Sequence, residues 1–266
     1  YFGHFADQLH LTWDEFFSLG KDGENRDSKF SMSVLAMNFS QYVNGVSRIH
    51  ARVSRDMFSY LYKGYFSREL HIDYVTNGVH HSTWTSKAWL NLYKQTFSEA
   101  YLQDESNDKY WKRIYEVEDS LIWNTHNNEK KNLIEFVKKR LKKDFTKRAE
   151  IPQLYFQTIN ELTEDKFVVG FARRFATYKR ANLLFTNLER LKQIVDSGVV
   201  FLFAGKAHPQ DGAGQNLIKR IIEISKMPEF VGKIIFLENY DMYIAKHLIR
   251  GVDLWLNMPT RPLEAS

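Results

Sequence analysis

The pattern of apolar and polar residues changes character near residue 160. Beyond it, short runs that are apolar throughout alternate with stretches of helical periodicity. The first helical stretch covers residues 177–197. Strands that are apolar on both faces and separated by helices are typical of a parallel sheet covered by helices on both sides. The sequence therefore predicts a doubly wound α/β fold with strands at 166–172, 199–205, 233–239 and 252–258.

The part of the chain before residue 160 is mainly helical in pattern. Aromatic-rich amphipathic stretches at 84–101, 110–123 and 132–145 predict helices, and the dipeptide Asn44-Gly45 predicts a turn. The helical pattern breaks over residues 152–165. We therefore expect two domains, a mainly helical one over residues 1–160 and a sheet-containing one over residues 161–266.

Composition narrows the class of protein. Hydrophobic residues form 44% of the 266-residue chain, which is enough for a globular core, and there is no cysteine. The absence of cysteine excludes disulfides and thiolate chemistry and suits the cytoplasm. No apolar run is long enough to span a bilayer, and the first twenty residues carry acidic side chains without the basic segment of a signal peptide. We expect a cytoplasmic protein without a membrane partner.

One segment carries a large share of the positive charge. Residues 129–148 hold nine Lys and Arg against three Asp and Glu, in a chain whose net charge is +5. A patch that binds polyanions is one interpretation. The other is a solvated helix face, and we favour it because apolar residues recur at helical spacing within the segment. No nucleic-acid partner is therefore expected.

Polar residues gather where the predicted strands end. Cations, amides and a carboxylate follow the four strands, at Arg173-Arg174, Gly205-Lys206, Asn239-Tyr240 and 257–264. Ligands of open parallel sheets bind beyond the carboxyl ends of the strands. Clustered arginine and lysine beside a helix start can bind a phosphate, so we expect an anion site here. Solvation of the same side chains at the surface is the alternative.

Five segments, taken in order and with their internal spacing, resemble the α-glucan phosphorylases. They are VNGVSRIH (43–50), TNGVHHSTW (76–84), FARRFATYKR (171–180), FAGKAHP (203–209) and residues 236–266. The residues of these segments most resemble those of the bacterial and archaeal branch of short phosphorylases. The resemblance implies a two-domain GT-B-type glycosyltransferase. Residues 1–160 would then be the C-terminal part of its N-terminal catalytic domain, and residues 161–266 the first half of its Rossmann-like C-terminal domain.

The resemblance also implies roles in the chemistry of glucan and phosphate. Arg174 and Lys179 match the pair that holds the substrate phosphate. His50 matches a histidine whose backbone carbonyl faces the sugar at the cleavage point. Asn77 and Glu264 match residues that bind glucose hydroxyls. The implied partners are inorganic phosphate and an α-1,4-glucan, and the implied reaction is phosphorolysis to glucose 1-phosphate. A homo-oligomer of the whole protein is left open.

Pyridoxal phosphate is the cofactor that the resemblance implies. Arg173 stands at the position of a basic contact to the cofactor phosphate, and Trp84 and Tyr240 match aromatic residues at the cofactor. Asp241 departs from the family, which often has arginine there. The family's Schiff-base lysine would follow Ser266, so we expect this chain alone to be inactive and to hold the cofactor weakly or not at all. No metal site is expected, because the histidines at 71, 80 and 81 lack carboxylates at ligand spacing.

Two other functions remain open at this point. A nucleotide-sugar-dependent glucan synthase of the same architecture would share a cationic phosphate site after a strand. A non-catalytic glucan-binding module would use aromatic side chains, and Trp111, Tyr115 and Trp123 are candidates for stacking on sugars.

Overall fold

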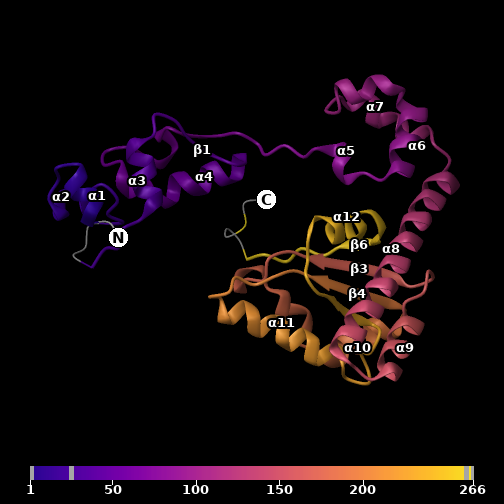
Figure 1. Ribbon diagram of the computed structural model, residues 1–266. Helices are drawn as coiled ribbons and strands as arrows, with labels where there is room; N and C mark the ends of the chain where they lie inside the picture. Colours follow the sequence, from indigo (N-terminus) through magenta and orange to yellow (C-terminus); the bar gives the residue numbers. More distant parts are fainter. Residues whose placement is uncertain (1–2, 24–26, 261–263, 265–266) are drawn as a thin grey trace. The chain divides into compact units, whose positions relative to one another are not determined.

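The computed structural model describes residues 3–23, 27–260 and 264. Two compact units are present, the first with residues up to 79 together with Glu264, and the second with residues 80–260. Figure 1 labels the elements along the chain. The division between the compact units falls between residues 79 and 80. The domain boundary expected near residue 160 remains a prediction. The helix over residues 119–148 belongs to the second unit because its apolar face packs into the core of the sheet that follows it.

The first unit is built around two short parallel strands. Its elements are α1 (Gly3–Gln8), α2 (Trp13–Ser18), α3 (Met32–Phe39), β1 (Val43–Gly45), α4 (Arg48–Met57), η1 (Ser59–Leu61), η2 (Ser67–Glu69) and β2 (Ile72–Tyr74). Strand β1 pairs with β2 in register Val43 to Ile72. Asn44 and Gly45, expected in a turn, instead end β1. The chain turns just after them into α4, whose first turn is capped by the Ser47 hydroxyl.

The second unit combines a parallel sheet with most of the helices. Its helices are α5 (His81–Trp84), α6 (Lys87–Phe97), α7 (Asp108–Trp111), α8 (Asp119–Arg148), α9 (Pro152–Glu161), α10 (Leu188–Asp196), α11 (Gly212–Ser225) and α12 (Met242–Gly251). Its 3-10 turns are η3 (Glu99–Gln103), η4 (Lys112–Glu116), η5 (Thr177–Lys179) and η6 (Ala181–Phe185). Its strands are β3 (Phe167–Ala172), β4 (Val199–Ala204), β5 (Ile234–Leu237) and β6 (Leu254–Trp255).

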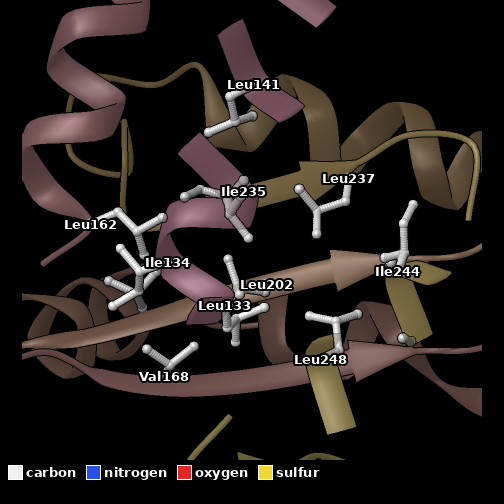
Figure 2. Close-up of a cluster of buried hydrophobic side chains, with 14 residues drawn as sticks. Leu133, Ile134, Leu141, Leu162, Val168, Leu202, Ile235, Leu237, Ile244 and Leu248 are labelled. Carbon is white, nitrogen blue, oxygen red and sulfur yellow. The ribbon is translucent and has the colours of Figure 1, made fainter. Parts of the chain in front are cut away.

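The sheet of the second unit has the order β5-β4-β3-β6, and all its strand pairs are parallel. Successive residues of β3 point to opposite faces: Val168 enters one buried cluster, and Val169 and Phe171 enter the other. Figure 2 shows the first cluster, in which Leu133 and Leu202 lie near Val168. A sheet buried on both faces confirms the α/β class with a parallel sheet.

The stretch after β3 differs from the single helix predicted over 177–197. It forms the two 3-10 turns η5 and η6, and the α-helix begins only at Leu188. Arg180 lies between the turns in the left-handed region, at φ 51°, which stops regular helix from passing through it. Asn187 then caps α10, because its side chain accepts a hydrogen bond from the Arg190 amide at 2.9 Å.

Helix α8 carries the basic segment, and several of its cations have partners within the chain. Arg140 pairs with Asp144 at 3.4 Å, and Arg148 contacts the carboxylates of Glu150 and Glu238. The opposite face of α8 packs Leu133, Ile134, Val137 and Leu141 into the core. These contacts favour the interpretation of an ordinary amphipathic helix face. In the described part of the chain, no helix combines the length and apolar character that a membrane span needs.

A buried group of charges fastens α8 to the sheet. The Asp253 carboxylate accepts hydrogen bonds from the Val168 amide at 2.7 Å and from the His126 ring at 2.7 Å, and it pairs with Lys130 at 2.8 Å. The Asp253 side chain is 5% exposed and that of Lys130 is 7% exposed. Burial alone would raise the pKa of Asp253, but the three donors outweigh burial and hold that pKa below its usual value.

We expect Asp253→Asn to destabilise the second unit by about 3 kcal/mol, because it leaves the Lys130 ammonium buried without a countercharge. Urea unfolding at pH 7 measures this loss. Because the folded-state pKa of Asp253 is depressed, its contribution is present above the unfolded value near 3.9 and is lost as pH falls further. The gap between wild type and variant should therefore shrink at low pH.

Asp196→Asn is the matched control, since Asp196 pairs with Lys192 and Lys233 at the surface. We expect a much smaller loss from it. Equal losses from the two variants would contradict the role given to the buried carboxylate.

Candidate functional site

The segment after β3 stays joined to the end of β4. The Arg173 amide donates to the Ala204 carbonyl at 3.2 Å, and the Phe175 amide donates to the Lys206 carbonyl at 2.9 Å. Gly205 makes this approach feasible, because a Cβ there would lie 2.0 Å from the Arg173 carbonyl oxygen. The Phe175 side chain is buried in the core below. The backbone that carries the predicted phosphate residues is therefore anchored on both sides.

The segment after β6 lies alongside the same stretch. The Arg173 guanidinium donates to the side-chain oxygen of Asn257, 84 residues further along the chain. Arg180 donates to the carbonyls of Met258 at 2.7 Å and Pro259 at 3.3 Å, and the Thr260 amide donates to the Tyr178 carbonyl at 2.8 Å. Hydrogen bonds therefore join the segments after β3, β4 and β6, which are three of the four strand ends that the sequence predicted to lie together. Arg180 serves here as a tie between segments.

The two residues matched to the substrate phosphate differ in environment. Arg174 is exposed, and within the described residues it makes no hydrogen bond or ion pair. Lys179 is buried, with 7% of its surface exposed, and its ammonium lies 5.0 Å from the centre of the Tyr178 ring. A solvent-facing guanidinium beside other cations is a group that an incoming oxyanion would pair with. That shared contact remains a prediction.

The end of β5 carries the aromatic residue matched to the cofactor. Asn239 adopts the left-handed conformation at φ 54°, and the half-buried Tyr240 packs against the core cluster next to α12. Burial raises the pKa of the Tyr240 hydroxyl, and the neighbouring Asp241 carboxylate raises it further. Asp241 itself caps α12 by accepting from the Ile244 amide at 2.8 Å. Its departure from the family pattern therefore has a structural role.

Trp84 lies at the other end of the same helix. The Arg250 guanidinium, in the last turn of α12, donates to three consecutive carbonyls of α5 and its cap: Thr83 at 3.1 Å, Trp84 at 2.9 Å and Thr85 at 3.1 Å. Helix α12 is ten residues long, or about 15 Å, and Tyr240 precedes its first turn. The main chain of Trp84 is thus held away from Tyr240. The sequence did not indicate a structural role for Arg250, because its hydrogen-bond partners are backbone carbonyls.

In the first unit, the strand pair brings His50 and Asn77 to one place. The Val46 amide donates to Nδ1 of His50 at 3.0 Å, and the Val46 carbonyl accepts from the Asn77 amide at 3.1 Å. Nδ1 is therefore an acceptor, which puts the proton of the neutral imidazole on Nε2. His50 is the third residue of α4, so its carbonyl is also a helix acceptor, and its contact to sugar remains a prediction.

Glu264 is half-buried and belongs to the first unit, with His50 and Asn77. Arg174 and Lys179 belong to the second unit. A common site for the two groups therefore also remains a prediction. Among the described residues, no cluster of three or more His, Asp or Glu side chains has the arrangement needed to hold a metal ion.

The family match and the named relatives of this chain all point to the same protein family. Residues 13–266 match a family described as carbohydrate phosphorylase. Maltodextrin phosphorylase of Thermococcus litoralis is 39% identical over 96% of this chain and 30% of its own length. Glycogen phosphorylase of Aquifex aeolicus is 40% identical over 93% of this chain and 36% of its own length. Glycogen phosphorylase of Mycobacterium tuberculosis is 35% identical over 96% of this chain. The chain spans about a third of the length of these relatives.

We expect Arg250→Met to loosen α5, because three carbonyls lose a charged donor at once. The free energy of opening should fall by about 1–3 kcal/mol. Hydrogen exchange at the Thr85 amide, which donates to the His81 carbonyl, measures it. Arg250→Lys keeps the charge but lacks the planar fork, so its effect should be intermediate. Exchange at Thr85 that is unchanged in both variants would contradict the clamp.

Proposed function

This chain belongs to the carbohydrate phosphorylase family, and we propose that the protein containing it cleaves α-1,4-glucans with inorganic phosphate to release glucose 1-phosphate. The names of its relatives, maltodextrin and glycogen phosphorylase, support this substrate class. The proposal extends to the two-domain GT-B architecture. In it, the parallel sheet that begins after residue 160 belongs to a Rossmann-like domain, and residues 1–160 form part of the preceding catalytic domain.

The observation that carries the proposal is the gathering of three strand ends around Arg174. The backbones after β3 and β4 are hydrogen-bonded to each other, and Arg173 and Arg180 are hydrogen-bonded to the segment after β6. Arg174 alone of these arginines is exposed without a hydrogen bond or ion pair among the described residues. A planar guanidinium can bind two phosphate oxygens at once. The buried Lys179 would add a second positive charge to the site.

The chemistry asked of these side chains is positioning and charge stabilisation. In phosphorolysis a phosphate oxygen forms a bond to C1 of the terminal glucose. The bond from C1 to the oxygen of the next glucose breaks, and that oxygen gains a proton. Arg174 and Lys179 would hold the dianion beside C1, where positive charge develops on the sugar. Asn77 and Glu264 would bind hydroxyls of the glucose unit, and the His50 carbonyl would face it.

The residues present suit the phosphate end of pyridoxal phosphate better than its ring. Arg173 supplies a cation whose guanidinium is held by Asn257 beside the strand ends. Tyr240 is a half-buried aromatic side chain that follows β5, the strand separated from β3 in the sheet by β4. The main chain of Trp84 is bonded near the opposite end of α12, so Trp84 is the least supported of the three contacts. When bound, the cofactor supplies a phosphate with a second pKa of about 6, suited to proton transfer near neutrality.

Phosphate binding by the 266-residue chain tests the central claim. We expect inorganic phosphate to bind, and Arg174→Met to weaken that binding by roughly tenfold to a hundredfold, because a charge-assisted hydrogen bond is lost. Isothermal titration calorimetry or ³¹P line broadening measures the affinity.

Arg190→Met is the matched control, since Arg190 is also an exposed arginine of the second unit but lies on α10. The control should leave the affinity unchanged. Equal weakening by the two variants would mean diffuse electrostatic attraction, and phosphate that binds Arg174→Met as tightly as wild type would sink the proposal.

A further inference from the structure

We infer a second glucan-binding surface on the second unit, formed by α6, α7 and η4 and separate from the strand ends. This inference rests on the proposed function, because the ligand it names is the proposed substrate. The surface is a cavity of about 350 Å³. It is lined by Tyr93, Asp108, Trp111, Lys112, Ile114 and Tyr115. None of these residues belongs to the segments after β3, β4, β5 or β6.

The inner wall of this cavity is held rigidly. The Trp111 indole donates to the Glu105 carbonyl at 2.7 Å, and its ring meets Tyr93 edge-on at 5.3 Å. Tyr93 in turn stacks on the fully buried Phe97, with ring centres 5.4 Å apart and planes inclined by only 7°. Both aromatic walls are therefore preorganised by the core beneath them. A preorganised surface binds with a smaller loss of conformational entropy.

Another wall of the cavity is formed by Tyr115, whose ring does not pack in the core. The Tyr115 side chain is 89% exposed. Among the described residues it makes no ring contact, hydrogen bond or ion pair. Tyrosine combines a large apolar face with a polar hydroxyl, which makes it a frequent contact residue when exposed next to a cavity. Tyr115 is therefore available to cover a ligand that enters against Trp111.

The chemistry of the cavity fits a neutral sugar chain. A glucopyranose ring offers an apolar C–H face to an aromatic ring and hydroxyls around its edge. Asp108 can accept from such hydroxyls and Lys112 can donate to them, and both side chains are exposed. One acid and one base leave the cavity without the excess of cations that a phosphorylated ligand or nucleic acid would require. An α-1,4-glucan meets both conditions, and holding it here would raise its concentration near the protein.

The third aromatic candidate from the sequence does not join this surface. Trp123 lies on α8, tilted against the His126 ring at 5.7 Å, and it does not line the cavity. Trp123 is 61% exposed. It can therefore serve as a control for Tyr115, because it is also an exposed aromatic side chain but lies outside the cavity.

Titration of the 266-residue chain with maltoheptaose in phosphate-free buffer tests the inference. We expect saturable binding, weakened about threefold to tenfold in Tyr115→Ala through loss of one aromatic contact. Trp123→Ala should bind like wild type. Asn77→Ala serves as a background in which the predicted glucose contact of the first unit is removed, and the effect of Tyr115→Ala should persist in it. Circular dichroism checks that each variant is folded.

The outcomes separate this inference from the proposed function. If maltoheptaose does not bind, or if Tyr115→Ala binds as tightly as wild type, the second surface is ruled out while phosphate binding at Arg174 can still stand. If Tyr115→Ala weakens maltoheptaose binding but the chain does not bind phosphate, the surface is real and the proposed phosphorolysis fails. Equal losses from Tyr115→Ala and Trp123→Ala would indicate non-specific stacking and would also overturn the inference.

Discussion

Burial of β3 on both faces is the constraint on which the second unit depends. Val168 faces one buried cluster, and Val169 and Phe171 face the other, so the strand has no solvated side. Charged residues cannot be placed along such a strand without large desolvation costs. They are therefore confined to its ends. The cations that begin at Arg173 lie beyond the carboxyl end because that is the first position where water, or an anion, can reach them.

At the opposite end of β3 a charged side chain is buried, but its charge is compensated by neighbouring donors. The Asp253 carboxylate is buried there, and it is tolerated because the Val168 amide, His126 and Lys130 all donate to it or pair with it. This group joins α8 to the sheet beside the apolar contacts of Leu133 and Ile134 with the same core cluster. A buried ion pair adds little net stability compared with apolar packing, but removing one partner is costly because the other charge stays buried.

The segments around the candidate site are connected mainly through backbone atoms. Arg180 and Arg250 each bind carbonyl groups of segments far away in the chain. Bonds to carbonyls depend on the path of the main chain and hardly at all on which side chains it carries. For this reason the sequence did not mark Arg250, and it did not tell Arg180, a structural tie, from Arg174, which is exposed and unpaired in the described structure.

The sequence by itself determined the alternation of buried strands and helices, and with it the parallel sheet and the place of the cations at its edge. Those features follow from local periodicity, which is written in neighbouring residues. Only the tertiary structure decided that α8 belongs with the sheet, that 177–187 forms 3-10 turns, and that Trp111 and Tyr115 share a cavity without Trp123. Each of these depends on contacts between distant residues, which no local pattern encodes.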